Sequence, residues 1–214
     1  MRNFLAAAAC ACAITIIPGR GLAQSSLDKL DALLQDISTL TADVTQLIVE
    51  SDGGILEESE IRMQLKKPDG FYWETIAPFP ELIVTNGKLL WNFQPDLEQV
   101  VIEDWDTSRS ELAAQLLNGR TRQLSEEYTI TITSEAGDDH AQFSLLPIAS
   151  ESVYTEITIS FIQAELDIIY LHSKNGQKTV WQFTNIERNL PLSDTLFEFV
   201  PPDGVEVIQN NYTN

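Results

Sequence analysis

The sequence predicts a mainly β protein with a few short helices, built on one extended antiparallel sheet. From Thr41 onward, apolar and polar residues alternate with period two in many short runs, as in strands with one buried and one wet face. Turn signals rich in Gly, Asn, Asp and Pro separate these runs, which is typical of hairpins. The chain has no internal repeat, low-complexity tract or linker, so one domain is expected over residues 24–214.

The segment that precedes the first strand predicts an amphipathic helix. Its apolar residues share one face at three- and four-residue spacing: Leu27, Leu30, Leu34 and Ile37, with Leu33 beside them. Ser25 or Ser26 can cap the first turn, and Asp28 is favourable there. The helix should end near Ser38.

The strands follow in order along the rest of the chain. Alternation is clearest at 61–65, 89–93, 126–134 and 153–161, and less strict at 165–172 and 179–185. Turns are expected at 51–54, 68–70, 85–88, 135–139, 174–176 and 201–204.

One later segment, residues 108–120, predicts a second short helix. Leu112, Ala113 and Leu116 share a side, and Asn118-Gly119 is a stop signal. A one-sided sheet must pack on another sheet, close into a barrel or be covered by helices. Two or three short helices can plug a strongly curved sheet and leave the space beneath partly hollow, as in lipid-binding barrels.

Residues 1–23 are expected to be a secretory signal peptide rather than part of the fold. A charged start, a short apolar run and small residues Gly21 and Ala23 before Gln24 fit a cleavage site. Lipid modification of Cys10 or Cys12 is the alternative, and it would leave a poor apolar run. Both cysteines leave with the signal, so the mature chain has no disulfide and no cysteine–metal site.

The charge balance excludes several partners. Loss of Arg2 and Arg20 leaves 11 basic residues against 32 acidic ones in 191 residues, a net charge of −21. Such a surface repels phosphate backbones and anionic headgroups, so we expect no nucleic acid partner and only transient membrane contact.

No catalytic or metal-binding pattern is present. His140 and His172 have no metal-ligand spacing, and no nucleophile elbow or phosphate-binding glycine loop occurs. The acidic run 135–140 fits a solvated turn better than a cation site. We therefore expect no enzyme activity, no metal and no cofactor.

Aromatic residues stand out instead, on two neighbouring strand segments. Phe71, Trp73, Trp91 and Phe93 occupy alternating positions. From the pattern alone they fit an ordinary core better than a binding cavity, because large aromatic side chains usually fill interiors. Lys67, in the basic pair before Pro68, could equally be a solvated strand end.

Several motifs, in this order, resemble the periplasmic outer-membrane lipoprotein carrier (LolA-like) family. LDALLQDISTLTADVTQL is similar to the family's opening helix and first strand. LKKPDGFYWE and APFPELIVTNGKLLWNFQPDLEQV are similar to its basic pair, aromatic pair and following strands, and LFEFVPPDGVEVI to its closing strand. The resemblance covers most of the mature chain and is weakest between Thr107 and Ser173.

The resemblance implies an unclosed antiparallel β-barrel with a short-helix lid over an apolar cavity. It implies a monomeric periplasmic carrier, without catalytic activity, that binds the acyl chains of lipoproteins. Such carriers receive cargo from an inner-membrane ABC-type release complex and deliver it to an outer-membrane lipoprotein receptor.

The resemblance also assigns roles to residues. The expected cavity residues are Ile61, Met63, Leu65, Phe71, Trp73, Trp91, Phe93, Leu112 and Leu116. The family has an arginine before the proline, which bonds lid carbonyls and holds the empty cavity shut. Here Lys67 occupies that position and lacks the planar fork of donors, so a looser lid latch is expected.

Three other functions stay open at this point. A lipid- or lipoprotein-sensing regulatory protein could use the same lidded sheet. The outer-membrane receptor would need a lipid-anchored cysteine, against which the signal region argues. A lipid-directed enzyme would need a nucleophile and a base, which the sequence does not place.

Overall fold

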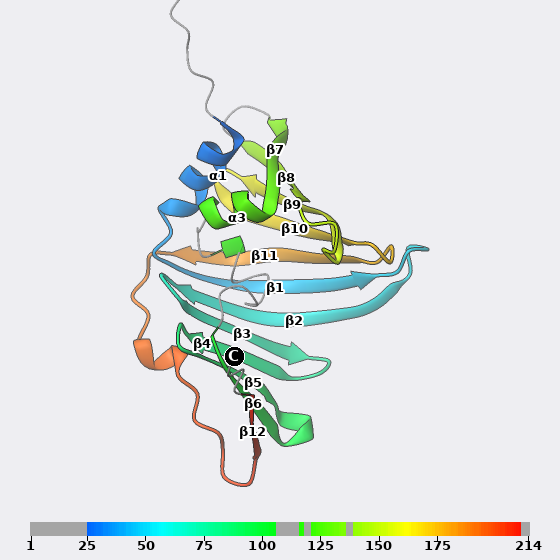
Figure 1. Cartoon of the computed structure of the whole chain (residues 1–214). Coiled ribbons are helices and arrows are strands. Elements are labelled where there is room, and N and C mark those ends of the chain that lie inside the picture. Colours follow the sequence, from blue (N-terminus) through cyan, green and yellow to red (C-terminus); the bar gives the residue numbers. More distant parts are fainter. Residues whose placement is uncertain (1–24, 106–115, 118–120, 136–138, 211–214) are drawn as a thin grey trace, which may run out of the picture.

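The computed structural model describes residues 25–105, 116–117, 121–135 and 139–210 (Figure 1). The helical elements are α1 (Ser26–Gln35), α3 (Thr121–Glu127) and the 3-10 turns η1 (Pro95–Leu97) and η2 (Asp194–Phe197). The first six strands are β1 (Thr39–Val49), β2 (Ile55–Lys66), β3 (Gly70–Ala77), β4 (Glu81–Asn86), β5 (Leu89–Gln94) and β6 (Gln99–Asp104). The others are β7 (Tyr128–Glu135), β8 (His140–Pro147), β9 (Tyr154–Ile162), β10 (Glu165–Ser173), β11 (Lys178–Arg188) and β12 (Glu206–Asn210).

All twelve strands form one sheet in the order β12-β6-β5-β4-β3-β2-β1-β11-β10-β9-β8-β7. Neighbours are antiparallel except β12 and β6, which are parallel. The edge strands β7 and β12 do not pair with each other, so the strongly curved sheet stays unclosed (Figure 1). The predicted mainly β fold with an unclosed antiparallel sheet is therefore confirmed.

The first helix begins as the sequence predicts and ends earlier. Ser25 is the N-cap, and its side chain and that of Asp28 form a reciprocal capping box. The helix ends at Gln35 rather than near Ser38. Asn189 accounts for the early exit, since its side chain accepts from the Ser38 N–H at 2.7 Å and donates to the Asp36 carbonyl at 2.9 Å.

The predicted strand 126–134 begins two residues later than expected, because α3 occupies its first two positions. Residues 126 and 127 complete α3, and the strand begins at Tyr128. This helix has a single buried leucine, Leu124, and therefore no apolar period that a sequence reading could detect. Of the predicted helix 108–120, only residues 116–117 lie among the described residues, and both are helical.

The sheet has two different ends. The helix end carries α1 and the turns β2–β3 and β4–β5. The loop end carries the turns β1–β2 and β3–β4, η1, and the turns β8–β9 and β10–β11 (Figure 1). The helix α1 contacts α3 and β7 at the first of these ends. The concave face of the sheet and the helices together enclose the main apolar core.

Candidate functional site

Five of the predicted cavity residues lie together on the concave face. Ile61, Met63 and Leu65 alternate along β2, and Phe71 and Trp73 alternate along β3. The register pairs Met63 with Trp73 and Leu65 with Phe71, so these side chains are cross-strand neighbours on one face. All five are buried in the main core.

Short helical segments cover this face at the helix end. Leu30 and Leu34 of α1 and the helical residues Leu116 and Leu117 are buried in the same apolar cluster. Leu116, one of the expected cavity residues, is therefore buried in the same cluster as the residues of β2 and β3. Leu112 lies outside the described residues.

Trp91 and Phe93 do not belong to this group, which corrects the expectation that they share its face. The register pairs Trp91 with Val84 and Ile102, on the opposite face from Trp73. They pack in a second apolar cluster with Val84 and Val100, beneath the C-terminal segment. Phe93 packs there against Phe199 with the two rings tilted and their centroids 5.1 Å apart. The convex face of β4–β6 is thus covered by its own chain.

The sequence reading missed the aromatic residues of the other half of the sheet. Trp181 of β11 packs edge-on against Trp73, with centroids 5.4 Å apart, and Phe143 packs edge-on against Phe161. All four are buried in the main core. The sequence pattern could have identified three aromatic residues of this half. Trp181 and Phe183 alternate within 179–185, and Phe161 ends the alternating run 153–161.

Lys67 lies at the junction of sheet and helix rather than in solvent. Its Nζ donates to the carbonyl of Leu34 in the last turn of α1 at 2.5 Å, and its backbone N–H donates to the Ser38 carbonyl at 2.9 Å. Burial lowers the pKa of Lys67, while Asp31 and Asp36 oppose that shift. A cation at the carbonyl end of a helix is also favourable for the helix dipole.

The neighbouring Lys66 holds a different segment. Its Nζ donates to the carbonyl of Leu192 at 2.8 Å and pairs with Asp194 at 2.5 Å, in and before η2. Phe197 of η2 lies close to Gly70, where an added Cβ would come within 3.0 Å of its ring. The two adjacent lysines thus contact different segments: Lys67 bonds to the end of α1, and Lys66 bonds to the C-terminal segment.

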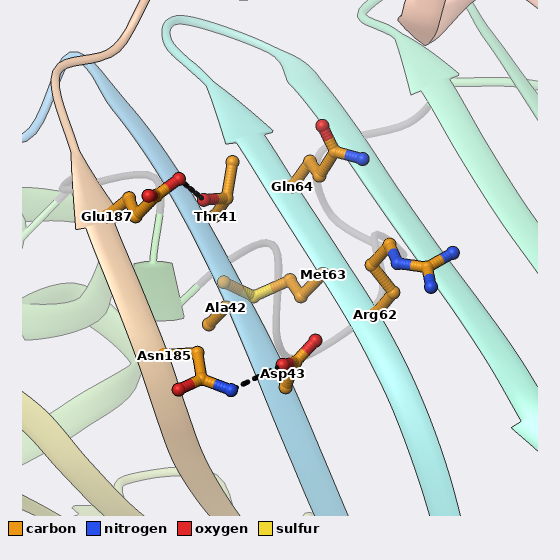
Figure 2. A pocket seen from close by; sticks show the side chains of 8 residues that line it. All are labelled: Thr41, Ala42, Asp43, Arg62, Met63, Gln64, Asn185 and Glu187. Carbon is orange, nitrogen blue, oxygen red and sulfur yellow. Dashed lines mark hydrogen bonds between the residues drawn. The ribbon is translucent and has the colours of Figure 1, made fainter.

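A pocket of about 380 Å³ lies on the convex face between β1, β2 and β11 (Figure 2). Asn185 donates to Asp43 across it at 2.8 Å, and Arg62 pairs with Glu74 at 2.9 Å. Its side chains are mostly polar or charged. This lining does not suit an acyl chain.

The described ranges lack two other kinds of feature, a cluster of metal ligands and a membrane-spanning helix. No group of three or more His, Cys, Asp or Glu residues within them could hold a metal ion. Neither helix in these ranges has the length and apolarity needed to cross a bilayer.

Comparison with known proteins gives a consistent match. Residues 35–200 match the family model described as outer membrane lipoprotein carrier protein LolA. The chain is 34% identical over 185 residues to the outer-membrane lipoprotein carrier protein of Hahella chejuensis, covering 86% of this chain and 88% of that protein. It is also 34% identical over 186 residues to the protein of that name in Azotobacter vinelandii, covering 87% and 89%.

A solved structure shares the fold. An uncharacterized conserved protein from Thermus thermophilus superposes with a TM-score of 0.55 at 14% identity, covering 86% of this chain and 97% of that one. At this identity the similarity concerns the fold alone.

Proposed function

This chain belongs to the LolA family of outer-membrane lipoprotein carrier proteins, and from that premise we propose that it carries lipoproteins with their acyl chains held against its concave face. The observation that carries the proposal is the apolar concave face under short helices. Ile61, Met63, Leu65, Phe71 and Trp73 form its centre. A carrier needs such a face because lipid must be kept from water while the protein diffuses.

The energetics of acyl burial are adequate for this task. Each buried methylene contributes roughly 0.8 kcal/mol, so even a partly inserted chain is held firmly. The helical covers pack on the sheet mainly through leucines, without a disulfide between described residues. An acyl chain can therefore replace one apolar contact with another when it enters.

We further propose that Lys67 is the latch of the cover. One side chain, reaching from the β2–β3 turn to the carbonyl of Leu34, ties α1 to the sheet. A lysine makes this bond through a single flexible ammonium, where the arginine expected from the family would offer a fork of donors. A looser resting cover follows from that difference.

The surroundings of the function are part of the proposal. Residues 1–23 direct the chain to the periplasm, and residues 24–214 act there as one monomeric domain without catalytic activity. Cargo comes from an inner-membrane ABC-type release complex and passes to an outer-membrane lipoprotein receptor. The net charge of −21 on residues 24–214, with 11 basic against 32 acidic residues, keeps the carrier from resting on anionic membranes.

The test compares two tryptophans on opposite faces. Trp73 is 8% exposed and Trp91 is 7% exposed, so alanine at either position removes a similarly buried ring. We expect Trp73→Ala to weaken binding of a fluorescent acyl probe at least tenfold, and Trp91→Ala to leave it unchanged. Thermal unfolding must show both variants folded at the assay temperature. Equal probe affinities in the two variants would contradict the proposal.

A further inference from the structure

The concave face changes character towards the loop end. Along β1, β2 and β3, the buried residues Val44, Ile61 and Trp73 are followed on the same face by Gln46, Ser59 and Thr75. These three polar residues line a pocket of about 370 Å³ that opens at the loop end. The indole N–H of Trp181 donates to Gln46 at 2.8 Å at the boundary. The pocket therefore continues the apolar face directly.

The wall of this pocket is acidic. Glu57, Glu81 and Asp96 all line it, and none of its ten lining residues is basic. None of the three carboxylates forms an ion pair within the described part of the chain. Their charge is therefore available to a cation brought by a ligand.

Glu81 stands in a fixed position beside an unsatisfied acceptor. The side-chain amides of Asn92 and Gln94 donate to its Oε1 at 3.0 and 3.2 Å. The Oδ1 atom of Asn92 is itself buried and has no hydrogen-bond partner among the described residues. Asn92 itself does not line the pocket, so the group that an N–H donor of a ligand would reach here is the carboxylate of Glu81.

The rim of the pocket is apolar and open to solvent. Phe79, in the β3–β4 turn, is 68% exposed, and Leu97, in η1, is 65% exposed. Both side chains line the pocket. Large exposed apolar residues at the edge of a pocket are typical of a surface that receives another chain.

From these observations we propose that the loop-end pocket, formed around Glu57, Glu81, Phe79 and Leu97, binds a lysine or arginine with an adjacent apolar residue in the polypeptide of the cargo, close to its acylated end. The inference rests on the proposed function. If acyl chains lie against the apolar half of the concave face, α1 blocks exit at the helix end, and the polypeptide leaves past this pocket. Cargo with a basic residue near the lipid is then held more tightly than neutral cargo.

The test uses two synthetic lipopeptides with identical acyl chains, one with Lys-Leu and one with Gln-Leu beside the acylated residue. The lysine can pair with both Glu57 and Glu81, and two partly exposed ion pairs tighten binding about fivefold. At low salt the Kd of the Lys-Leu lipopeptide should therefore be about fivefold lower than that of the Gln-Leu lipopeptide. That ratio should fall towards one at 0.5 M NaCl, which requires no variant.

Variants then locate the effect. Glu57→Gln/Glu81→Gln should bring the ratio of the two Kd values to about one. The matched control Glu165→Gln/Asp203→Asn removes the same charge from exposed positions outside the pocket and should keep the ratio. A ratio of one in the wild-type chain, or a ratio that the pocket variant retains, would overturn the inference and leave the carrier function standing.

Two further outcomes separate the sources of failure. If neither lipopeptide bound, the carrier function and the pocket assignment would both be overturned. If an acyl-free Lys-Leu peptide bound as tightly as its lipopeptide, the pocket would serve a free protein segment, and the assignment to cargo would be overturned.

Discussion

Replacement of Lys67 by methionine removes the bond between the β2–β3 turn and α1 while keeping most of the side chain's volume. Hydrogen bonds to a charged group contribute about 1.5–3 kcal/mol. Here the gain is smaller, because burial of the ammonium, which lowers the pKa of Lys67, offsets part of it. The Leu34 carbonyl also keeps two backbone donors, the N–H groups of Asp36 and Ile37. A net loss of about 1 kcal/mol in the stability of the closed cover follows.

Amide hydrogen exchange measures that loss directly. A loss of about 1 kcal/mol makes opening about fivefold more frequent, so the amides of α1 should exchange about fivefold faster. If acyl binding requires an open cover, affinity for a fluorescent acyl probe rises by a similar factor. Lys67→Arg, which restores a fork of donors, should slow exchange instead.

The adjacent lysine provides the matched control. Lys66→Met removes the same charge one residue away, yet its partners Leu192 and Asp194 belong to the C-terminal segment. It should leave exchange in α1 at the wild-type rate. If Lys67→Met left exchange in α1 and probe affinity unchanged, or if both lysine variants accelerated exchange equally, the latch role would be refuted.

Two further predictions concern stability. Burial, with Glu74 adding to it, raises the pKa of Tyr72 to about 12. The folded state therefore keeps a proton that the unfolded state loses above pH 10, and stability falls as pH rises from 10 to 12. Tyr72→Phe should make denaturant-measured stability less steeply pH-dependent in that window, and an unchanged slope would count against the assignment. At Gly87, with φ +84°, an added Cβ would lie 2.5 Å from the Cβ of Asp69, whereas at Gly204, with φ +89°, it would meet nothing within 4 Å. Both alanine variants lose about 1 kcal/mol from backbone strain. Gly87→Ala should lose more by urea unfolding, and equal losses would show that the turn yields without cost.

The sequence predicts the local order of this fold well. The capping pair Ser25 and Asp28 marked the start of α1, and period-two alternation placed the buried faces of β2 and β3. These features depend on neighbouring residues, so a single sequence contains them. The end of α1 depends on Asn189, which is more than 150 residues away from it, and no local pattern could reveal that contact.

The sequence alone could not show on which face of the sheet Trp91 lies, because that too depends on contacts beyond its own strand. Alternation gives the two faces within a strand, but the turns decide which face continues in the next strand. Paired residues on neighbouring strands lie on the same face of the sheet. Trp73 of β3 pairs with Ile83 of β4, so odd-numbered residues share one face in both strands. Across the next turn Thr85 of β4 pairs with Leu90 of β5, so the even-numbered residues of β5 lie on that face. Odd positions therefore face inward in β4 and outward in β5. The C-terminal segment then buries the outward residues, so both faces of β5 carry apolar residues.

The central claim is that this chain holds an acylated lipoprotein on its concave face. The most direct measurement is native mass spectrometry of the full chain, purified without detergent from a periplasmic extract after co-expression with a tagged outer-membrane lipoprotein. We expect a one-to-one complex that Trp73→Glu or Phe71→Glu abolishes, while Lys66→Met leaves it intact. An empty protein that also fails to bind a fluorescent acyl probe would contradict the claim and make the concave aromatic residues an ordinary core.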